Sequence, residues 1–480
     1  MPRHATNPWL ILVLICFAQF MVVLDATVVN VALPSIQKDL GLSEANLQWI
    51  INAYTLAFGG FLLLGGRAGD LLGRKRLFLF GLVVFTVASL LNGLAVNSTM
   101  LIACRGLQGL GAAFISPAAL AIISTTFEEG AERAKALGVW AAIAIGGSAV
   151  GLIVGGALTQ LLSWPWIFFI NVPVGVAVFA LSLWYLPESK AEGVHRSFDV
   201  AGAVAVTAGL MSLVFAIVQV PEKGWTSAQT IGTLVLSAVL LASFVVIEQR
   251  SKAPLVRLSI FRVRSLLTAN TTMFLVGAGL FAMFFFNSLY LQRVLGYGPL
   301  EAGLAFLPFT FGIIVSAGLA SRFAPRVGVR PVAIVGMVLT IVGMLYLTHI
   351  QANGTYAADV LPALLLTSLG MGAVFLPLTL IATTGLDDHD QGLASGLFNT
   401  SQQIGGALGL AILTSLAASK TSSAHGVSQA EALVEGFHVA FLGGAVFISL
   451  ALVTFLALLR KHHVARIEAE AASSPLPDAV

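Results

Sequence analysis

The stretch LDATVVNVALP, from Leu24 to Pro34, places a single carboxylate, Asp25, inside an apolar segment that runs from about Trp9 to Leu33. No other acidic residue lies as deep in a long apolar segment of the chain. An aspartate near a bilayer centre costs roughly 2.5 to 3.5 kcal/mol, so it usually has a buried partner, lines a watery cavity or binds a proton. We interpret Asp25 as a proton site. The alternative is a structural acid that only hydrogen-bonds neighbouring helices.

The composition excludes an ordinary soluble protein. Of the 480 residues 58% are apolar and 10% are charged, whereas roughly a quarter are charged in soluble proteins. The net charge of +3 forms no basic stripe for nucleic acid, and the two cysteines, Cys16 and Cys104, both lie in apolar segments. Neither a disulfide framework nor a metal-binding cysteine cluster is therefore expected. The first apolar run is longer than the apolar core of a signal peptide, so we interpret it as an uncleaved span.

The apolar stretches predict an all-α membrane protein with fourteen transmembrane helices, because a helix needs roughly 20 apolar residues to cross the hydrocarbon core. The predicted spans cover residues 10–33, 47–66, 77–97, 99–124, 134–159, 166–186, 200–219, 230–247, 266–291, 301–322, 331–350, 359–383, 393–418 and 437–459.

The distribution of basic residues predicts the orientation of these spans. With a cytoplasmic N-terminus, twenty of the 25 Lys and Arg residues fall in the inner segments. The remaining five are the outer residues Lys38, Lys223, Arg293 and Lys420, and Arg105 inside a span. Inner loops of membrane proteins carry an excess of positive charge. Because the number of spans is even, both termini are expected in the cytoplasm.

A weak internal repeat suggests two equivalent halves. The residues after the second span recur 252 residues later after the tenth, pairing Gly66, Asp70, Gly73 and Arg74 with Gly318, Arg322, Pro325 and Arg326. Parallel repeats of this kind occur in transporter folds. The predicted organisation is an N-terminal six-helix bundle at 1–190, a linker with two extra spans at 191–262, a C-terminal six-helix bundle at 263–465 and a cytoplasmic tail at 466–480.

The loop GGRAGDLLGRKR, between the second and third spans, combines glycines with charges at fixed spacing. Gly66, Asp70, Gly73, Arg74 and Lys75 follow the form G-x-x-x-D-x-x-G-R-[RK] and resemble the first motif of the major facilitator superfamily. Glycine allows a tight turn at a helix end, and the charges could form a switchable gate at the cytoplasmic surface. A plain basic hairpin would explain the basic cluster but not the placement of Asp70.

The span at 99–124 carries an arginine and a glutamine three residues apart, Arg105 and Gln108, which share one helix face. An arginine in a span implies a cavity or an acidic partner. Snorkelling of Arg105 to the outer interface is the alternative, because it lies only a few residues into the span. The pattern R-x-x-Q-G is similar to a second motif of the same superfamily, whose arginine is linked to proton transfer. Asp25 and Arg105 both fall in the outer halves of their spans, so we expect them to come within reach of each other.

The next span, 134–159, carries a pattern of glycines that resembles the antiporter motif of drug exporters. This pattern consists of Gly138, Gly147, Gly151, Gly155 and Gly156. Glycines repeated every four residues let another helix approach closely, and ordinary helix packing is the alternative to a role in exchange. Leu152 stands where that family usually has proline, so a kink at this point is not implied.

Further segments extend the resemblance to fourteen-span drug/proton antiporters over nearly the whole chain. WPWIFFINVPVG, from Trp164 to Gly175, is similar to a family signature, with Pro165 in place of the usual arginine. The segment GLASGLFNTSQQIGGALG, from Gly392 to Gly409, resembles the thirteenth span of that family. The resemblance implies the major-facilitator fold, two six-helix bundles plus two inserted central helices.

The residues that would contact substrate are the least defined part of the sequence. An apolar cavity with a few polar groups is typical of small-molecule sites, although for any single aromatic residue packing is the simpler explanation. The candidates are Tyr54, Gln108, Phe285, Asn287, Asn399 and Gln403.

The resulting hypothesis is a proton-coupled exporter of amphipathic drugs, dyes, antibiotics or natural products. It implies a multi-pass protein of a bacterial inner membrane that functions as a monomer, uses H⁺ as coupling ion and has no cofactor, metal or nucleic-acid partner. Proton-coupled uptake of a small organic solute on the same fold is the alternative. A membrane sensor or scaffold would leave Asp25, Arg105 and Asp70 without a role. An enzyme is not expected, because no catalytic motif is present in the sequence.

Overall fold

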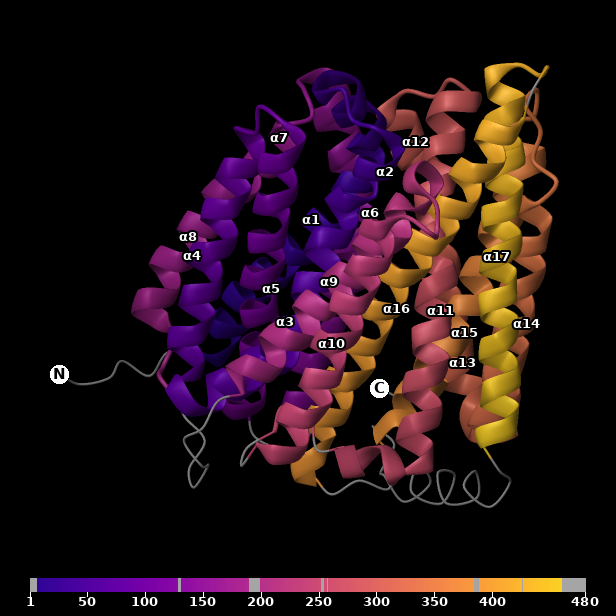
Figure 1. Ribbon diagram of the computed structural model, residues 1–480. Coiled ribbons are helices and arrows are strands. Elements are labelled where there is room, and N and C mark those ends of the chain that lie inside the picture. The colour runs from indigo at the N-terminus through magenta and orange to yellow at the C-terminus, as the bar shows by residue number, and fades with distance from the viewer. Residues whose placement is uncertain are drawn as a thin grey trace. The chain divides into compact units, whose positions relative to one another are not determined.

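The computed structural model describes residues 7–127, 131–189, 199–251, 254–256, 258–383, 388–424 and 426–459. Within these ranges every regular element is a helix, as the coiled ribbons of Figure 1 show. The expectation of an all-helical protein is confirmed.

The helices follow one another along the chain with short connections. The first ten are α1 (Pro8–Leu40), α2 (Glu44–Leu47), α3 (Trp49–Leu72), α4 (Arg74–Gly93), α5 (Ser98–Thr126), α6 (Ala131–Leu161), α7 (Trp166–Phe169), α8 (Asn171–Tyr185), α9 (Val200–Lys223) and α10 (Ala228–Arg250). The others are η1 (Leu258–Arg262), α11 (Arg264–Leu289), η2 (Tyr290–Val294), α12 (Pro299–Ala305), α13 (Leu307–Val327), α14 (Val329–Leu347), η3 (Tyr356–Val360), α15 (Leu361–Thr383), α16 (Asp388–Ser423) and α17 (Gln429–Leu458).

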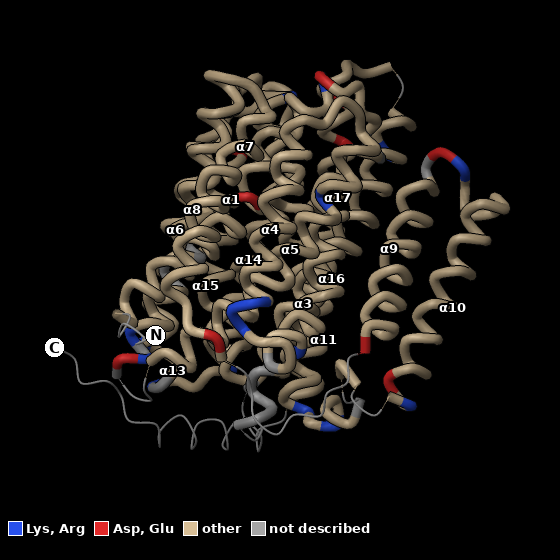
Figure 2. The backbone as a smooth tube through the Cα atoms, turned by 90° about the vertical axis from the view of Figure 1, so that its left-hand side faces the viewer, with Lys and Arg blue, Asp and Glu red and all other residues tan. Residues whose placement is uncertain are grey.

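Thirteen helices in the described ranges are long and apolar enough to cross a membrane. The predicted span at 134–159 coincides with α6, whose apolar stretch in those ranges, Gly146–Leu161, is shorter. Most of each tube in Figure 2 is free of charge, and the charged residues gather near helix ends. Charges at helix ends can reach the aqueous interfaces while the apolar middles remain in the hydrocarbon core.

The chain divides into two compact units. Unit 1 comprises Met1–Met211 and Ser237–Leu255, and unit 2 comprises Ser212–Leu236 and Val256–Val480. The helices α9 and α10, which the sequence assigned to a separate linker at 191–262, are therefore each divided between the units. The predicted tail at 466–480 lies outside the described residues.

Helix ends follow local capping chemistry. The side chain of Asn7 accepts a hydrogen bond from the Trp9 amide at the start of α1, and Asn97 caps α5 through the Met100 amide at 2.9 Å. At its other end α1 stops at Gly41, which has a φ of 61°. Glycine adopts the left-handed backbone conformation at little energetic cost, so it suits the end of a helix. At the start of a helix, a side-chain oxygen accepts a hydrogen bond from a backbone N–H that the helix leaves unpaired.

A single glycine separates the two helices in each of two corresponding places. Gly73 joins α3 to α4 with a φ of 114°, and Gly328 joins α13 to α14 with a φ of 89°. The repeat proposed from sequence paired Gly73 with Pro325, which is wrong by three residues. The reversal needs a backbone conformation that glycine adopts readily and proline cannot. The position equivalent to Gly73 is therefore Gly328.

Glycines also set the distance between neighbouring helices. In unit 1 a Cβ on Gly109 would collide with the Tyr54 carbonyl oxygen of α3. In unit 2 a Cβ on Gly405 of α16 would collide with the carbonyl oxygen of Phe274 in α11. Close backbone approach at small residues is a main source of helix association in membranes, where lipid is as apolar as the side chains.

Replacing Gly405 should therefore weaken unit 2. We expect Gly405→Ala to lower the free energy of unfolding by about 1 to 3 kcal/mol, the usual range for overpacking. Gly318→Ala is the matched control, since no atom lies within 4 Å of the added Cβ in α13. Thermal unfolding of the purified protein in detergent measures both variants. Equal midpoints would contradict the assigned packing.

Candidate functional site

Asp25 lies inside unit 1 and is completely buried. Its Oδ2 accepts a hydrogen bond of 2.6 Å from a terminal guanidinium nitrogen of Arg105. Its Oδ1 accepts hydrogen bonds from Nε2 of Gln108 at 2.7 Å and from Nδ2 of Asn171 at 2.9 Å. Three helices, α1, α5 and α8, thus bring their polar side chains together around one carboxylate.

The guanidinium of Arg105 is enclosed as fully as its partner, with only 1% of the residue exposed. Its Nε donates to the carbonyl oxygen of Ile50 at 2.9 Å. The ring of Tyr54 covers one face, with its centroid 4.3 Å from the guanidinium carbon, and the ring of Phe168 lies at 5.8 Å. Such contacts stabilise a desolvated cation. Arg105 therefore does not snorkel to the interface, so that alternative is excluded.

Gln108 connects the ion pair to α4. Its Oε1 accepts from Arg105 at 2.7 Å and from Nδ2 of Asn92 at 2.8 Å. Its Nε2 donates to Asp25 and to the hydroxyl of Ser89, both at 2.7 Å. All four hydrogen-bonding positions of the amide are therefore occupied.

This arrangement can change its charge only at a cost, because every group that touches Asp25 is an N–H donor. A carboxylate can accept all three hydrogen bonds, whereas a protonated carboxyl needs an acceptor for its own proton. The geometry is thus that of the ionised acid. Proton uptake requires the surrounding side chains to rearrange, which makes the cluster capable of coupling a proton to a change in structure.

The structure unites part of the predicted site and adds residues to it. Asp25, Arg105 and Gln108 come together, and the ring of Tyr54 covers Arg105. Contact of Tyr54 with substrate stays a prediction. The pattern W-x-W-x-F-x-x-N contained Asn171 but gave it no role. The other additions are Ser89, Asn92, Phe168 and the carbonyl of Ile50. An isolated asparagine near the end of an apolar helix was the available signal for Asn92.

The glycine stripe of α6 packs against α1 beside the carboxylate. A Cβ on Gly151 would collide with the Thr27 hydroxyl, and one on Gly155 would lie 2.9 Å from Cα of Val28. Gly147 faces Val23 and Phe20 of the same helix. The stripe therefore fixes the position of the α1 segment that carries Asp25.

The remaining motif positions of α6 behave differently. No atom lies within 4 Å of a Cβ added to Gly138, while Gly156 is buried. Leu152, in the place of the family proline, is also buried, and α6 runs without a break from Ala131 to Leu161. Leucine retains the backbone N–H that proline lacks, so the helix continues through this position.

The loop predicted as a gate is fastened to the end of α8. Oε1 of Glu188 accepts from the backbone N–H of Lys75 at 3.2 Å, and Oε2 lies 3.5 Å from Nε of Arg76. In return Nζ of Lys75 donates to the Leu183 carbonyl at 2.8 Å. An acid at the start of α4 and a cation at the end of α8 both complement the helix dipoles.

The other predicted gate residues lie around the same turn. The amide of Arg74 donates to the Ser189 carbonyl at 3.0 Å, and Gly73 faces the Glu188 carboxylate so closely that a Cβ would collide with it. Gly66, about two turns before Gly73 in α3, lies in ordinary contact distance of Pro117. Asp70 belongs to α3, but its side chain lies outside the part of the structure that is described.

The substrate residues predicted in unit 2 differ in how far they are exposed. Phe285 and Asn287 in α11 are buried, with 1% and 0% exposed, and Nδ2 of Asn287 donates to the Met283 carbonyl. In α16 Asn399 is exposed and Gln403 is half-buried. Their contact with substrate stays a prediction.

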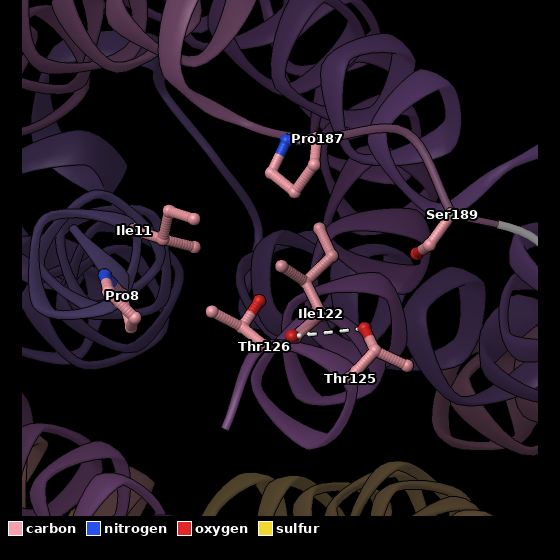
Figure 3. A pocket seen from close by; sticks show the side chains of 7 residues that line it. All are labelled: Pro8, Ile11, Ile122, Thr125, Thr126, Pro187 and Ser189. Atoms are coloured by element: carbon pink, nitrogen blue, oxygen red, sulfur yellow. Dashed lines mark hydrogen bonds between the residues drawn. The ribbon is translucent and has the colours of Figure 1, made fainter. Parts of the chain in front are cut away.

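A cavity of about 350 Å³ lies elsewhere, between the start of α1, the end of α5 and the segment after α8 (Figure 3). None of the predicted substrate residues lines it, and neither do the residues around Asp25. Its lining consists of Pro8, Ile11, Ile122, Thr125, Thr126, Pro187 and Ser189. A cavity of this size is at the lower end of the range for small-molecule sites, and its lining offers no charged group to fix a ligand.

The buried ion pair predicts a specific stability pattern. Arg105→Met leaves the Asp25 carboxylate unpaired, so we expect the free energy of unfolding to fall by about 3 to 5 kcal/mol at neutral pH. The double variant Asp25→Asn with Arg105→Met removes that charge and should regain most of the loss. Acidification should also stabilise the single variant, because protonation neutralises Asp25. Thermal unfolding of the variants at neutral and at acidic pH measures these changes in stability. Equal losses of stability in the single and double variants would contradict the pairing.

Comparisons with known proteins agree with this architecture. Residues 15–410 match the model of the Major Facilitator Superfamily. The chain is 40% identical over 459 residues to the puromycin resistance protein pur8 of Streptomyces alboniger, covering 93% of this chain and 91% of the relative. It is also 40% identical over 451 residues to the cephamycin export protein CmcT of Amycolatopsis lactamdurans, covering 92% and 91% of the two chains.

Solved structures share the fold at much lower sequence identity. The nucleoside transporter NupG superposes with a TM-score of 0.67 at 12% identity, over 95% of this chain and 100% of that one. A bacterial homologue of the human lysosomal transporter Spinster gives a TM-score of 0.66 at 15% identity, over 96% and 98%. The family match and the similarity to the resistance and export proteins lead to one conclusion: this chain is a multi-pass membrane protein that belongs to the major facilitator superfamily.

Proposed function

We propose that the protein is a proton-coupled exporter of small amphipathic compounds. The observation that carries this proposal is the Asp25 cluster, in which a fully buried carboxylate pairs with a fully buried arginine inside a membrane-spanning bundle. Ionisable residues in such positions are rare and usually mark proton or ion pathways. For a purely structural role, a neutral amide in place of Asp25 would serve as well, because it could make hydrogen bonds without burying two charges.

The available driving force is sufficient without nucleotide hydrolysis. Each elementary charge that crosses 100 mV is worth about 2.3 kcal/mol, and each pH unit adds about 1.4 kcal/mol. One or two protons per cycle could therefore sustain a concentration gradient of several orders of magnitude. Asp25 would alternate between the ionised form in the structure and a protonated form with rearranged partners.

The relatives indicate the class of substrate. Proteins named for resistance to or export of puromycin, cephamycin and tetracenomycin C are 35 to 40% identical to this chain. These compounds differ in structure, so the shared feature we infer is an amphipathic small molecule. The residues predicted for its contact, Phe285, Asn287, Asn399 and Gln403, remain part of this proposal.

Further properties belong to the same proposal. The coupling ion is H⁺, the transporter acts as a monomer, and no cofactor takes part. The protein resides in the inner membrane of a bacterium with both termini in the cytoplasm. The positive-inside distribution of Lys and Arg supports this orientation.

Substituting Asp25 tests the coupling directly. We expect Asp25→Asn to abolish drug-induced proton release in proteoliposomes, because an amide cannot exchange a proton at working pH. Asp39→Asn is the matched control: it makes the same change on the same helix, at an exposed residue that accepts a hydrogen bond from Trp164. Puromycin, tetracenomycin C and lincomycin serve as first probes, with proton release followed by a pH-sensitive dye. Unchanged exchange in folded Asp25→Asn protein would refute the role.

Widening the glycine stripe should slow transport by displacing α1. We expect Gly151→Ala to reduce the export rate at least tenfold, because its Cβ collides with Thr27 two residues from the carboxylate. Gly138→Ala, on the same helix with open space around it, should leave the rate unchanged. Export of a transported probe from everted vesicles provides the measurement. Identical rates for the two variants would show that the stripe does not position Asp25.

A further inference from the structure

Asn92 is buried completely in α4, and its amide is only half satisfied. Nδ2 donates to Oε1 of Gln108 at 2.8 Å. Among the described residues, Oδ1 has no hydrogen-bond partner. An unpaired polar atom in a dry interior is costly and calls for a physical reason.

The reason lies in the amide of Gln108, which separates Asn92 from the ion pair. Its donor side faces Asp25 and Ser89, and its acceptor side faces Arg105 and Asn92. If this amide rotates by half a turn, the two sides exchange. Oε1 then lies where it can accept hydrogen bonds from the O–H of a protonated Asp25 and from the Ser89 hydroxyl.

The rotation also places Nε2 of Gln108 against Asn92, and this donor needs an acceptor. The unpaired Oδ1 provides one if the Asn92 amide rotates as well. Asn92 then has one satisfied and one unsatisfied atom in either orientation, so its own bonding favours neither. The charge on Asp25 decides between the two arrangements, which gives the pair the character of a switch.

We propose that Asn92 is a positioning residue that acts through Gln108, and that the two amides rotate together when Asp25 takes up a proton. This inference rests on the proposed function of Asp25 as the proton site. In the step, a hydronium ion gives up one O–H bond and leaves as water, and a new O–H bond forms at Oδ1 of Asp25. The charge of the Asp25 and Arg105 pair changes from zero to +1.

Arg105 remains held in the second arrangement. It loses its bond to Oε1 of Gln108 and the ionic attraction of Asp25, and it must move away from the Nε2 that replaces this oxygen, because both groups are donors. It keeps the Ile50 carbonyl at 2.9 Å and the face of the Tyr54 ring at 4.3 Å. These neutral groups do not depend on the proton state, so the cation has a place to stay while Asp25 is neutral.

Few titratable groups compete with Asp25 at this depth. The guanidinium of Arg105 and the hydroxyl of Tyr54 are the nearest, and the buried thiol of Cys104 lies beside Arg105 on α5. On the packed helices the described charged groups lie near helix ends, at the end of α1, the end of α3, the start of α4, the start of α6 and just after α8. A pH response of the cluster therefore belongs to Asp25.

The test is an infrared titration of the purified transporter in lipid. The carboxyl C=O stretching band that Asp25→Asn removes reports protonation of Asp25 and needs no substrate. Asn92→Leu keeps the side-chain shape but offers no acceptor to the rotated Gln108. In the ionised state Oε1 of Gln108 still accepts from Arg105, whereas in the protonated state the rotated Nε2 is left without an acceptor. The midpoint should therefore move about one pH unit toward acid, a tenfold change in proton concentration.

Controls separate the switch from simple packing. Thr86→Val, on the same helix, replaces a hydroxyl without a partner among the described residues and should not move the midpoint. The shift from Asn92→Leu should vanish in a Gln108→Leu background, because Asn92 acts through that amide. If Asn92→Leu does not fold, Asn92→Ala removes the same acceptor and should shift the midpoint in the same direction.

Three results would overturn the inference, and they are distinguishable. An Asp25 band whose midpoint does not respond to Asn92 substitution, or moves toward alkaline pH, refutes the coupled rotation and leaves the proton site intact. A spectrum in which no carboxyl band depends on Asp25 at any pH refutes the proton site itself. A shift that persists in the Gln108→Leu background shows that Asn92 does not act through Gln108.

Discussion

The ion pair between Asp25 and Arg105 is the interaction on which unit 1 depends. Each group is almost completely removed from water, and the desolvation of two charges is costly enough to cancel much of their attraction. The pair is tolerated because the carboxylate accepts three hydrogen bonds and the guanidinium meets a carbonyl, an amide and an aromatic face. Helices α1, α3, α4, α5 and α8 must all be in register for these contacts to exist together. The polar cluster therefore specifies how the bundle packs more than it stabilises it.

That register depends in turn on the absence of side chains at selected positions. Gly109 lets the α5 backbone approach the Tyr54 carbonyl, and Gly111 lets it approach the Phe85 backbone. Gly151 does the same for α6 against α1. Hydrogen bonds of 2.6 to 2.9 Å tolerate little displacement, so one added methyl group between two of these helices would pull donors and acceptors apart. The hydrogen bonds of the polar cluster thus depend on the close helix packing that these glycines allow.

Sequence alone predicted the charged part of this site and little of its neutral part. Asp25 and Arg105 stand out because charges are rare in apolar spans, and Gln108 follows from its spacing of three residues. Asn92 and Asn171 carry no charge and come from helices distant in sequence, so nothing in the pattern indicated which face they present. Span positions were predicted well because the bilayer fixes helix length. The pairing of Gly73 with Pro325 failed because the match relied on basic residues, whereas the conformation of the turn decides the equivalence.

The location of the cluster constrains how a proton can influence transport. The carboxylate contacts only side chains of unit 1 among the described residues, and its hydrogen-bonding positions are filled by the protein. A substrate cannot replace one of these donors without first opening the bundle. Under the proposed function the simpler route is mechanical: protonation of Asp25 would weaken the contact of α5 with α1. The residues of α1 that face α6 pack against the glycine stripe. A ligand shifts a conformational equilibrium only through its differential affinity for the two states. For this protein we propose that the two states differ in proton affinity because they differ in how α1 packs.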